Sequence, residues 1–270
     1  MPTLETLRIS FYDWNLVSPN NTFVGWANYA SILRDPAFWD VVRQSVLYVV
    51  AALAGDFLVP LGLALATVGL ARREGVFWQS LIFTPTVVPI SIGALLWLWI
   101  LLPQGGPLNT ILAALHLGAP VWLNDPHLAL WSVSAIAAWK YLGFNYLFLI
   151  AALAAIPAEL LEAARLDGAR RLTLLRRVVL PMIAPALAFV AVTTFLQALE
   201  ITFVPIQVLT VGGPANSSNQ LVYSVYQDGF QYFIAGKASA KAILMLVLLS
   251  AAAIWQIRLL ERDAAGEGAA

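Results

Sequence analysis

The chain has 270 residues, of which 60% are hydrophobic and only 11% charged, and its mean hydropathy is +0.79. Soluble domains average about 45–50% apolar and about 25% charged residues, so this composition excludes an ordinary soluble domain. Fifteen basic residues balance fifteen acidic ones, which removes the electrostatic case for nucleic acid as a partner. With no cysteine and two histidines, the chain is not expected to form disulfides, thiol-based catalytic sites or metal sites.

Five stretches are long and apolar enough to cross a bilayer as helices, because a hydrocarbon core of about 30 Å requires roughly 20 residues. In chain order they are Leu47–Leu70, Val76–Leu102, Leu128–Ile156, Val178–Phe203 and Ala238–Ile257. Prolines fall within several of them, which transmembrane helices tolerate because neighbouring groups satisfy the freed backbone. The sequence therefore predicts an all-α, polytopic integral membrane protein with five spans.

The charges between the spans orient the chain in the membrane. Arginines gather on alternate connections and after the last span: Arg72, Arg73, Arg165, Arg170, Arg171, Arg176, Arg177, Arg258 and Arg262. The opposite side contains Pro103–His127 and Pro205–Gly236, neither of which has a lysine or an arginine. By the positive-inside rule the arginine-rich side is cytoplasmic, so we expect a cytoplasmic C-terminus.

This orientation divides the chain into three regions. Residues 1–43 form an extracytoplasmic N-terminal segment, residues 44–260 a transmembrane domain with a cytoplasmic loop at 156–181, and residues 261–270 a cytoplasmic tail. An odd number of spans places the N-terminus outside, yet residues 1–43 contain no signal peptide or apolar run. Either this segment is translocated unaided, or an opening helix is absent from this sequence.

The cytoplasmic loop 156–181 carries signals for two short helices. Pro157 suits the first turn of a helix, and Glu159 favours the positive end of the helix dipole. Gly168 permits the left-handed turn that ends one helix before the next begins. Apolar residues at helical spacing then continue to Pro181. We expect a helix–turn–helix element parallel to the membrane on its cytoplasmic face.

Within this loop, one set of residues stands in a characteristic order: Glu162, Ala163, Ala164, Gly168, Leu180 and Pro181. The order and spacing resemble the EAA motif of binding-protein-dependent ABC importers, with Val178 in place of the consensus isoleucine. A motif of this length, in the predicted cytoplasmic loop before the penultimate span, is much more specific than a short pattern.

Other stretches resemble the carbohydrate-uptake branch of that family, the maltose and glycerol-3-phosphate type of permease. They are Ser10–Asn15, Phe23–Gly25, Asn28–Tyr29, Trp139–Lys140, Asn145–Phe148 and Gly212–Pro214. Members of this branch normally have a transmembrane helix before the segment that resembles Ser10–Asn15. The resemblance thus implies the transmembrane domain of a type I ABC importer, with five spans present and an N-terminal sixth missing.

The resemblance also implies an assembly in the plasma membrane of a bacterium or archaeon. Two permease subunits, here different chains, surround a path for a sugar or polyol phosphate, and an extracytoplasmic binding protein delivers the substrate. Separate cytoplasmic subunits bind ATP and Mg²⁺, because this chain lacks the G-x-x-x-x-G-K-[ST] loop and holds no cofactor. The residues that couple the permease to the ATPase would be Glu162, Ala163, Ala164, Asp167, Gly168, Leu180 and Pro181.

Ionisable groups within the spans need an explanation, because one at the bilayer centre costs roughly 3 kcal/mol. Asp56 and Lys140 lie at matching positions in two spans that run inward from the same side, so they reach similar depths. One interpretation is an Asp56–Lys140 ion pair that joins two helices. The other is that Lys140, with Asn145 and Tyr146, faces the pathway and binds hydroxyls or a phosphate.

Gln197 and Glu200 lie toward the outer end of their span, where they either contact the substrate or sit at the level of the lipid headgroups. Two other functions remain as alternatives to an importer subunit. A polytopic membrane enzyme would need acids, bases or metal ligands gathered at one depth. An autonomous secondary transporter would need no ATPase.

Overall fold

The structure is a computed structural model that describes residues 2–15, 17 and 21–267. The side chains of 261–270, including that of Arg262, lie outside the described residues. The chain opens with α1 (Pro2–Ile9), a two-stranded antiparallel ribbon of β1 (Tyr12–Asp13) and β2 (Thr22–Phe23), and α2 (Ala27–Arg34). All further elements described are helical, so the predicted all-α class is confirmed.

The first long helix consists of α3 (Pro36–Ala52), the π-helical segment η1 (Leu53–Leu58) and α4 (Val59–Thr67). It starts earlier than the predicted Leu47, because Asp35 caps it and Pro36 suits its first turn. The Asp35 carboxylate accepts a hydrogen bond from the backbone N–H of Ala37 at 3.0 Å. The boundary predicted at residue 43 therefore falls inside α3.

The remaining helices follow in chain order. They are α5 (Arg72–Val87), α6 (Ile90–Ile100), α7 (Pro107–Ala114), α8 (Ala129–Ala154), α9 (Ala158–Leu166), α10 (Arg171–Leu174), η2 (Leu175–Val179), α11 (Leu180–Met182), α12 (Ala184–Pro205), η3 (Ile206–Thr210), α13 (Leu221–Tyr226), η4 (Gln227–Gln231) and α14 (Ala235–Glu267). The segments named η are π-helical turns.

Among the described residues, four stretches are continuous, long and apolar enough to cross a membrane: Pro36–Thr67, Ala129–Ala154, Ala184–Thr210 and Ala235–Gln256. A fifth consists of α5 and α6, which pass the same test together but are bent by 98° at the break between them. Five apolar stretches are thus present as predicted. The continuous second span, Val76–Leu102, was a wrong prediction, because its helix breaks before Pro89.

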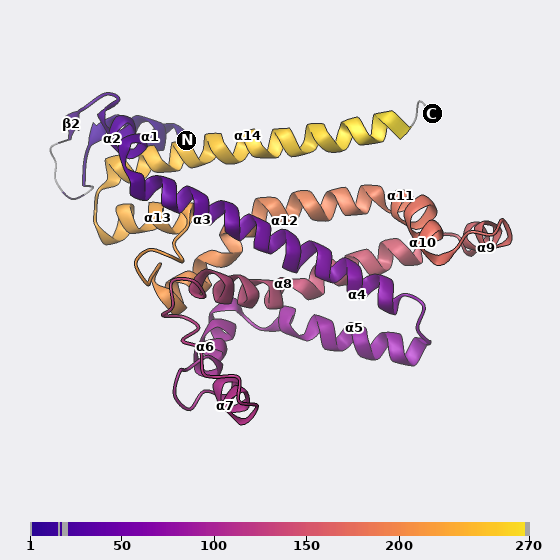
Figure 1. Ribbon diagram of the computed structural model, residues 1–270. Helices are drawn as coiled ribbons and strands as arrows, with labels where there is room; N and C mark the ends of the chain where they lie inside the picture. The colour runs from indigo at the N-terminus through magenta and orange to yellow at the C-terminus, as the bar shows by residue number, and fades with distance from the viewer. Residues whose placement is uncertain (1, 16, 18–20, 268–270) are drawn as a thin grey trace.

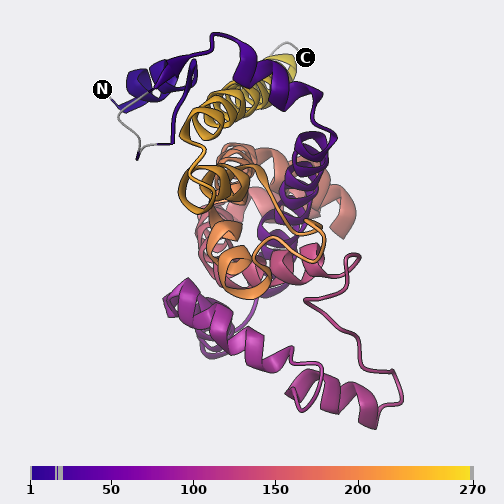
Figure 2. The same cartoon turned by 90° about the vertical axis from the view of Figure 1, so that its left-hand side faces the viewer.

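The long helices lie side by side, with α8 among α3–α4, α5 and α12 (Figure 1). One end of the bundle carries α9, α10 and the turn between α4 and α5, and the other carries α6, α7 and α13. The far end of α14 lies at the same end as α9 and α10. Viewed along the bundle, α6 and α7 project away from the packed helices (Figure 2).

Small residues bring the neighbours of α8 unusually close. A Cβ added at Gly143 of α8 would lie 2.6 Å from the carbonyl oxygen of Ile82 and 2.8 Å from the Cα of Phe83, both on α5. On another side of α8, a Cβ at Gly55 would lie 2.6 Å from that of Ala138. Close backbone approach through small residues is how helices pack in membranes, where lipid is as apolar as leucine.

The break between α5 and α6 is held by a reciprocal pair of hydrogen bonds to α8. The Lys140 ammonium donates to the backbone carbonyl of Thr86 in the last turn of α5, and the Thr86 hydroxyl donates to the carbonyl of Lys140 at 3.2 Å. A lysine near a helix C-terminus satisfies an orphan carbonyl and complements the helix dipole. Lys140 therefore caps the end of α5 at the 98° bend.

At the opposite end from α9, a loop before α13 is buried between the long helices. Tyr48 on α3 donates to the carbonyl of Ser218 at 2.8 Å, and the Gln220 amide donates to the carbonyl of Leu199 at 3.0 Å. Next to it, Lys241 on α14 and Asp228 on η4 form an ion pair of 2.7 Å. These contacts fix α13 and α14 to the bundle.

Replacing Gly143 with alanine should loosen the contact between α5 and α8, because the new methyl group overlaps the backbone of α5. We expect a loss of about 1–3 kcal/mol of stability, the usual cost of overpacking. Thermal unfolding of the purified protein, followed by size-exclusion chromatography, measures it. Gly62→Ala is the matched control, since nothing lies within 4 Å of its added Cβ. Equal stability of the two variants would contradict the tight contact.

Replacing Lys140 with methionine should release the end of α5, because the Thr86 carbonyl loses its partner at a cost of about 1–3 kcal/mol. Spin labels at the exposed positions Leu81 on α5 and Leu95 on α6 report the bend through their distance distribution. We expect a narrow distribution in the parent and in Lys140→Arg, which keeps a cationic donor, and a broad one in Lys140→Met. A narrow distribution in Lys140→Met would show that the cap does not hold the bend.

Candidate functional site

The predicted helix–turn–helix element is present and projects from one end of the bundle (Figure 1). Pro157 occupies the N-cap position of α9, and Glu159 lies in its first turn. Gly168 has a φ of +82°, the left-handed conformation that glycine adopts without steric cost. The N–H of Ala169 donates to the carbonyl of Ala164 at 3.0 Å and closes the turn.

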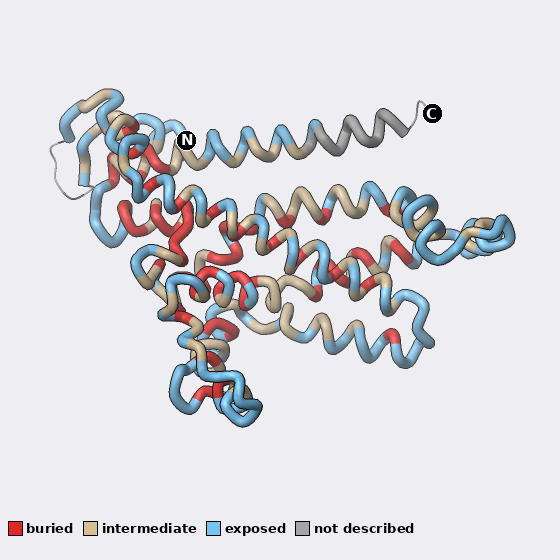
Figure 3. Tube along the Cα trace, viewed as in Figure 1, coloured by how far each residue is buried: buried red, intermediate tan, exposed pale blue. Residues whose placement is uncertain are grey.

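No residue in the outer part of this element is buried, and most are exposed (Figure 3). Glu162 and Ala163 are exposed, Ala164 is half-buried, and the exposed fraction of the Leu166 side chain reaches 88%. Leu160 and Leu172 of the same element are exposed as well, so the apolar exposure is not confined to one side chain.

The base of the element is packed into the bundle. Val179 and Leu180 contact a buried cluster that includes Leu153 of α8, Ile183 before α12 and Val190 of α12. The base of the element is therefore in side-chain contact with α8 and α12, and close-packed interiors of this kind transmit strain.

Two of the predicted pathway residues are buried between helices instead. The Asn145 amide donates to the backbone carbonyl of Asp56 at 2.5 Å and lies 3.4 Å from the Thr194 hydroxyl. The Tyr146 hydroxyl lies 2.7 Å from that of Thr67 and is fully buried. In this structure both side chains join α8 to its neighbours, and contact of Asn145 and Tyr146 with a substrate stays a prediction.

The Asp56–Lys140 ion pair, one of the two interpretations of these charges, is not formed. No ion pair within the described part of the chain involves either residue. Lys140 points to α5, whereas Asp56 lines a cavity of about 10 Å³ with Tyr48, Ser134 and other residues of α3, α8 and α12. Matching depth along two helices does not fix which way each side chain points around its helix axis.

Gln197 and Glu200 belong to a longer stripe of polar residues along α12 and η3. Sequence reasoning identified these two residues but not the rest of the stripe. Thr193 precedes them and Gln207 follows them on the same side of α12 and η3. Within the described residues, the side chains of Gln197 and Glu200 form no hydrogen bond or ion pair. The i, i+4, i+7 spacing of Thr193, Gln197 and Glu200 is the signal from which the stripe follows.

The stripe continues onto α8 and forms what we call the polar face, made of Tyr141, Phe144, Thr193, Gln197 and Glu200. Tyr141 lies within electrostatic range of Glu200, and Phe144 is exposed. An ionisable side chain directed into lipid costs roughly 3 kcal/mol, so such residues face water or another protein chain. Contact of Gln197 and Glu200 with a substrate, or a position at the level of the lipid headgroups, stays a prediction.

At one end of the polar face, aromatic rings of α8 and α12 are in contact. The rings of Phe148 on α8 and Phe189 on α12 lie 5.0 Å apart at its inner end, toward α9. Lys140 lies partly exposed at its edge, next to α5. Sequence reasoning missed Tyr141 and Phe144 because aromatic residues in a span are usually packing residues.

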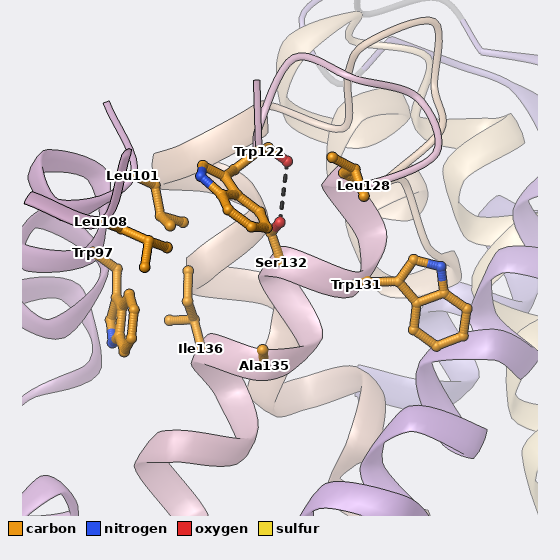
Figure 4. A pocket seen from close by; sticks show the side chains of 9 residues that line it. All are labelled: Trp97, Leu101, Leu108, Trp122, Leu128, Trp131, Ser132, Ala135 and Ile136. Atoms are coloured by element: carbon orange, nitrogen blue, oxygen red, sulfur yellow. Dashed lines mark hydrogen bonds between the residues drawn. The ribbon is translucent and has the colours of Figure 1, made fainter. Parts of the chain in front are cut away.

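The opposite end of the bundle holds a different kind of pocket, of about 240 Å³, between α6, α7 and α8. Figure 4 shows its lining, with Trp97 and Trp131 on opposite sides. Its polar side chain, Ser132, already donates to the carbonyl of Trp122 at 3.1 Å. This pocket offers apolar surface and no unpaired charge, so the polar face is the better candidate for a polar substrate.

A metal site is not indicated in the part of the chain that the structure describes, where no group of three histidine, cysteine, aspartate or glutamate residues could hold an ion.

Comparisons with known proteins agree with this arrangement. UgpA of Agrobacterium fabrum, an sn-glycerol-3-phosphate transport system permease protein, is 34% identical over 245 residues, covering 90% of this chain and 82% of that protein. YurN of Bacillus subtilis, a probable ABC transporter permease protein, is 32% identical over 263 residues, covering 96% of this chain and 89% of that protein.

A solved structure has the same fold. The bacterial alginate ABC transporter in complex with an alginate pentasaccharide-bound periplasmic protein contains a chain that matches with a TM-score of 0.83 and 22% identity. The match covers 97% of this chain and 88% of that chain. At this identity the likeness concerns the fold alone.

The family model for the inner membrane component of binding-protein-dependent transport systems matches residues 58–265, which include the polar face and the whole α9–α11 element. The expected multi-pass membrane location and the role of a transport subunit rather than an enzyme follow from this match and from the apolar helices. The chain belongs to the family of binding-protein-dependent transport system inner membrane components.

Proposed function

We propose that this chain is the permease subunit of an ATP-driven importer and that its polar face lines the path of a sugar or polyol phosphate. The observation that carries the proposal is the exposed pair Gln197 and Glu200, which no group in the described chain satisfies although both lie in a membrane span. Water and a hydroxyl-rich substrate supply the hydrogen bonds that lipid cannot.

The chemistry of the polar face suits a polyol. Gln197 both donates and accepts hydrogen bonds, and Glu200 accepts them from hydroxyls. Tyr141 and Phe144 add aromatic surface for the apolar side of a sugar ring. UgpA, the relative at 34% identity, is named for sn-glycerol-3-phosphate transport, which supports a small phosphorylated polyol as one substrate class. Lys140 is the cation nearest the pathway, but it must leave the Thr86 carbonyl to reach a phosphate.

Coupling to ATP would occur through α9–α11. Its exposed outer part, with Glu162, Ala163 and Ala164, would dock onto a cytoplasmic subunit that binds ATP and Mg²⁺. Asp167 and Gly168 form the turn, and Leu180 and Pro181 form the base next to the bundle. Closure of the ATP-binding subunits would displace this element and, through its packed base, change the relative positions of α8 and α12.

The remaining partners follow from the two ends of the bundle. The end with α9, α10 and the far end of α14 would be cytoplasmic, so that the tail 261–270 is cytoplasmic and the N-terminal segment 1–43 extracytoplasmic. The end with α6, α7 and α13 would receive the substrate-binding protein. A second permease subunit, a different chain, would complete the pathway opposite the polar face.

Replacing Gly168 with valine should uncouple transport from ATP hydrolysis, because a β-branched residue at a φ of +82° is strained by about 1–3 kcal/mol. We expect normal insertion into the membrane but loss of the co-purified ATP-binding subunit and of substrate-stimulated ATPase activity. Gly69→Val is the control, since it lies in the turn after α4 with no neighbour within 4 Å of its added Cβ and no positive φ. Normal assembly and stimulation in Gly168→Val would rule out the coupling role.

Replacing Gln197 or Glu200 with leucine should reduce uptake of the transported polyol into proteoliposomes by about tenfold, the effect of one lost hydrogen bond of about 1.4 kcal/mol. Leu196→Ala is the control on the neighbouring exposed surface of α12. A panel of neutral sugars and glycerol-3-phosphate assigns the substrate. Uptake that stays unchanged in both variants, while Leu196→Ala is equally active, would exclude the polar face from the pathway.

A further inference from the structure

A cavity of about 300 Å³ lies between the end of α4, the start of α5 and the inner part of α8. It is at the end of the bundle that carries α9 and α10, remote from the polar face. Its polar lining consists of Thr67, Arg72 and Gln79, and its apolar lining includes Val68, Val76 and Ile150.

Two polar groups of this cavity lack partners among the described residues: the Arg72 guanidinium, which only donates hydrogen bonds, and the Gln79 amide, which donates and accepts them. The Thr67 hydroxyl is already engaged with the carbonyl of Leu63 and the hydroxyl of Tyr146. The side chains of Arg72 and Gln79 have no hydrogen bond or ion pair within the residues that the structure describes. No carboxylate lines the cavity. A ligand that fits must therefore bring acceptor oxygens, and beside an arginine a negatively charged group fits best.

The remaining lining of the cavity is apolar and suits the hydrocarbon part of a ligand. Val68, Val76 and Ile150 form an apolar surface next to the charged group, and both valines are exposed. A soluble anion would satisfy Arg72 but would leave this surface in contact with water. The exposed Phe77 and Trp78 on the next positions of α5 are residues typical of the membrane–water interface. An amphiphile with an anionic head and an acyl chain satisfies both halves of the cavity.

The spacing along α5 agrees with a lipid in its normal orientation. Gln79 lies two turns beyond Arg72, which corresponds to about 10 Å along the helix toward the middle of the bundle. A lipid phosphate next to Arg72 would place the ester groups deeper, near Gln79. Basic pockets between transmembrane helices are known to bind anionic headgroups.

We propose that this cavity is a specific site for an anionic phospholipid. The phosphate contacts the Arg72 guanidinium, the ester oxygens accept from the Gln79 amide, and one acyl chain lies along Val68, Val76 and Ile150. Because the lipid touches both the α4–α5 turn and α8, it braces the helix that leads directly into the α9–α11 element. The site is independent of the transported substrate.

Native mass spectrometry of the purified transporter, titrated with phosphatidylglycerol or phosphatidylcholine, tests the proposal. We expect the parent to bind phosphatidylglycerol preferentially and Arg72→Gln to bind it roughly fivefold more weakly, the effect of one basic residue near a lipid surface. Arg73→Gln is the matched control, because it removes the same charge from the same turn at a position outside the cavity lining. Gln79→Leu should also weaken binding.

Three results would overturn the proposal. Equal losses in Arg72→Gln and Arg73→Gln would mean diffuse attraction rather than a site. Displacement of phosphatidylglycerol by millimolar inorganic phosphate would identify a site for a soluble anion. Absence of bound phosphatidylglycerol from the complex with ATP-binding subunits, but not from the permease alone, would make the cavity part of that subunit interface. None of these readouts depends on transport, so they test the lipid site separately from the proposed function.

Discussion

The constraint on which the structure depends is that backbone polar groups within a bilayer must find partners inside the protein. At the end of α5 and in the π-helical segment η1, a polar side chain of α8 supplies the partner. Lys140 satisfies the carbonyl of Thr86 where α5 ends, and Asn145 satisfies that of Asp56 within the π-helical segment η1. Polar residues that look like substrate ligands are therefore used to complete the backbone.

Because polar side chains of α8 satisfy backbone carbonyls of its neighbours, several sides of α8 are occupied by helix packing. Buried hydrogen bonds and close contacts at Gly143 occupy the sides of α8 that meet α4, α5 and η1. On α12, the side chains of Gln197 and Glu200 remain exposed and without partners among the described residues. A membrane protein tolerates such groups where water, lipid headgroups or another subunit reaches them, and for this reason the proposed pathway runs along Gln197 and Glu200.

The same helices connect this face to the projecting element. Leu153, Ile183 and Val190 form a buried cluster between the polar face and α11, and Leu180 packs against it. The turn at Gly168, by contrast, is exposed and has no neighbour that an added side chain would meet. An exposed outer surface on a packed base is the arrangement that the proposed coupling role requires.

The sequence by itself determined the five apolar stretches, the side of the arginine-rich loops, and the helix–turn–helix around Gly168, because hydropathy, charge and turn chemistry are local properties that add along the chain. Only the tertiary structure decided which way each polar side chain points and how sharply the second stretch bends. Depth follows from residue number, but direction around a helix axis follows from its neighbours. For that reason Asp56 and Lys140 share a level and yet form no pair, and two prolines that permit a kink become a 98° break where Lys140 caps α5.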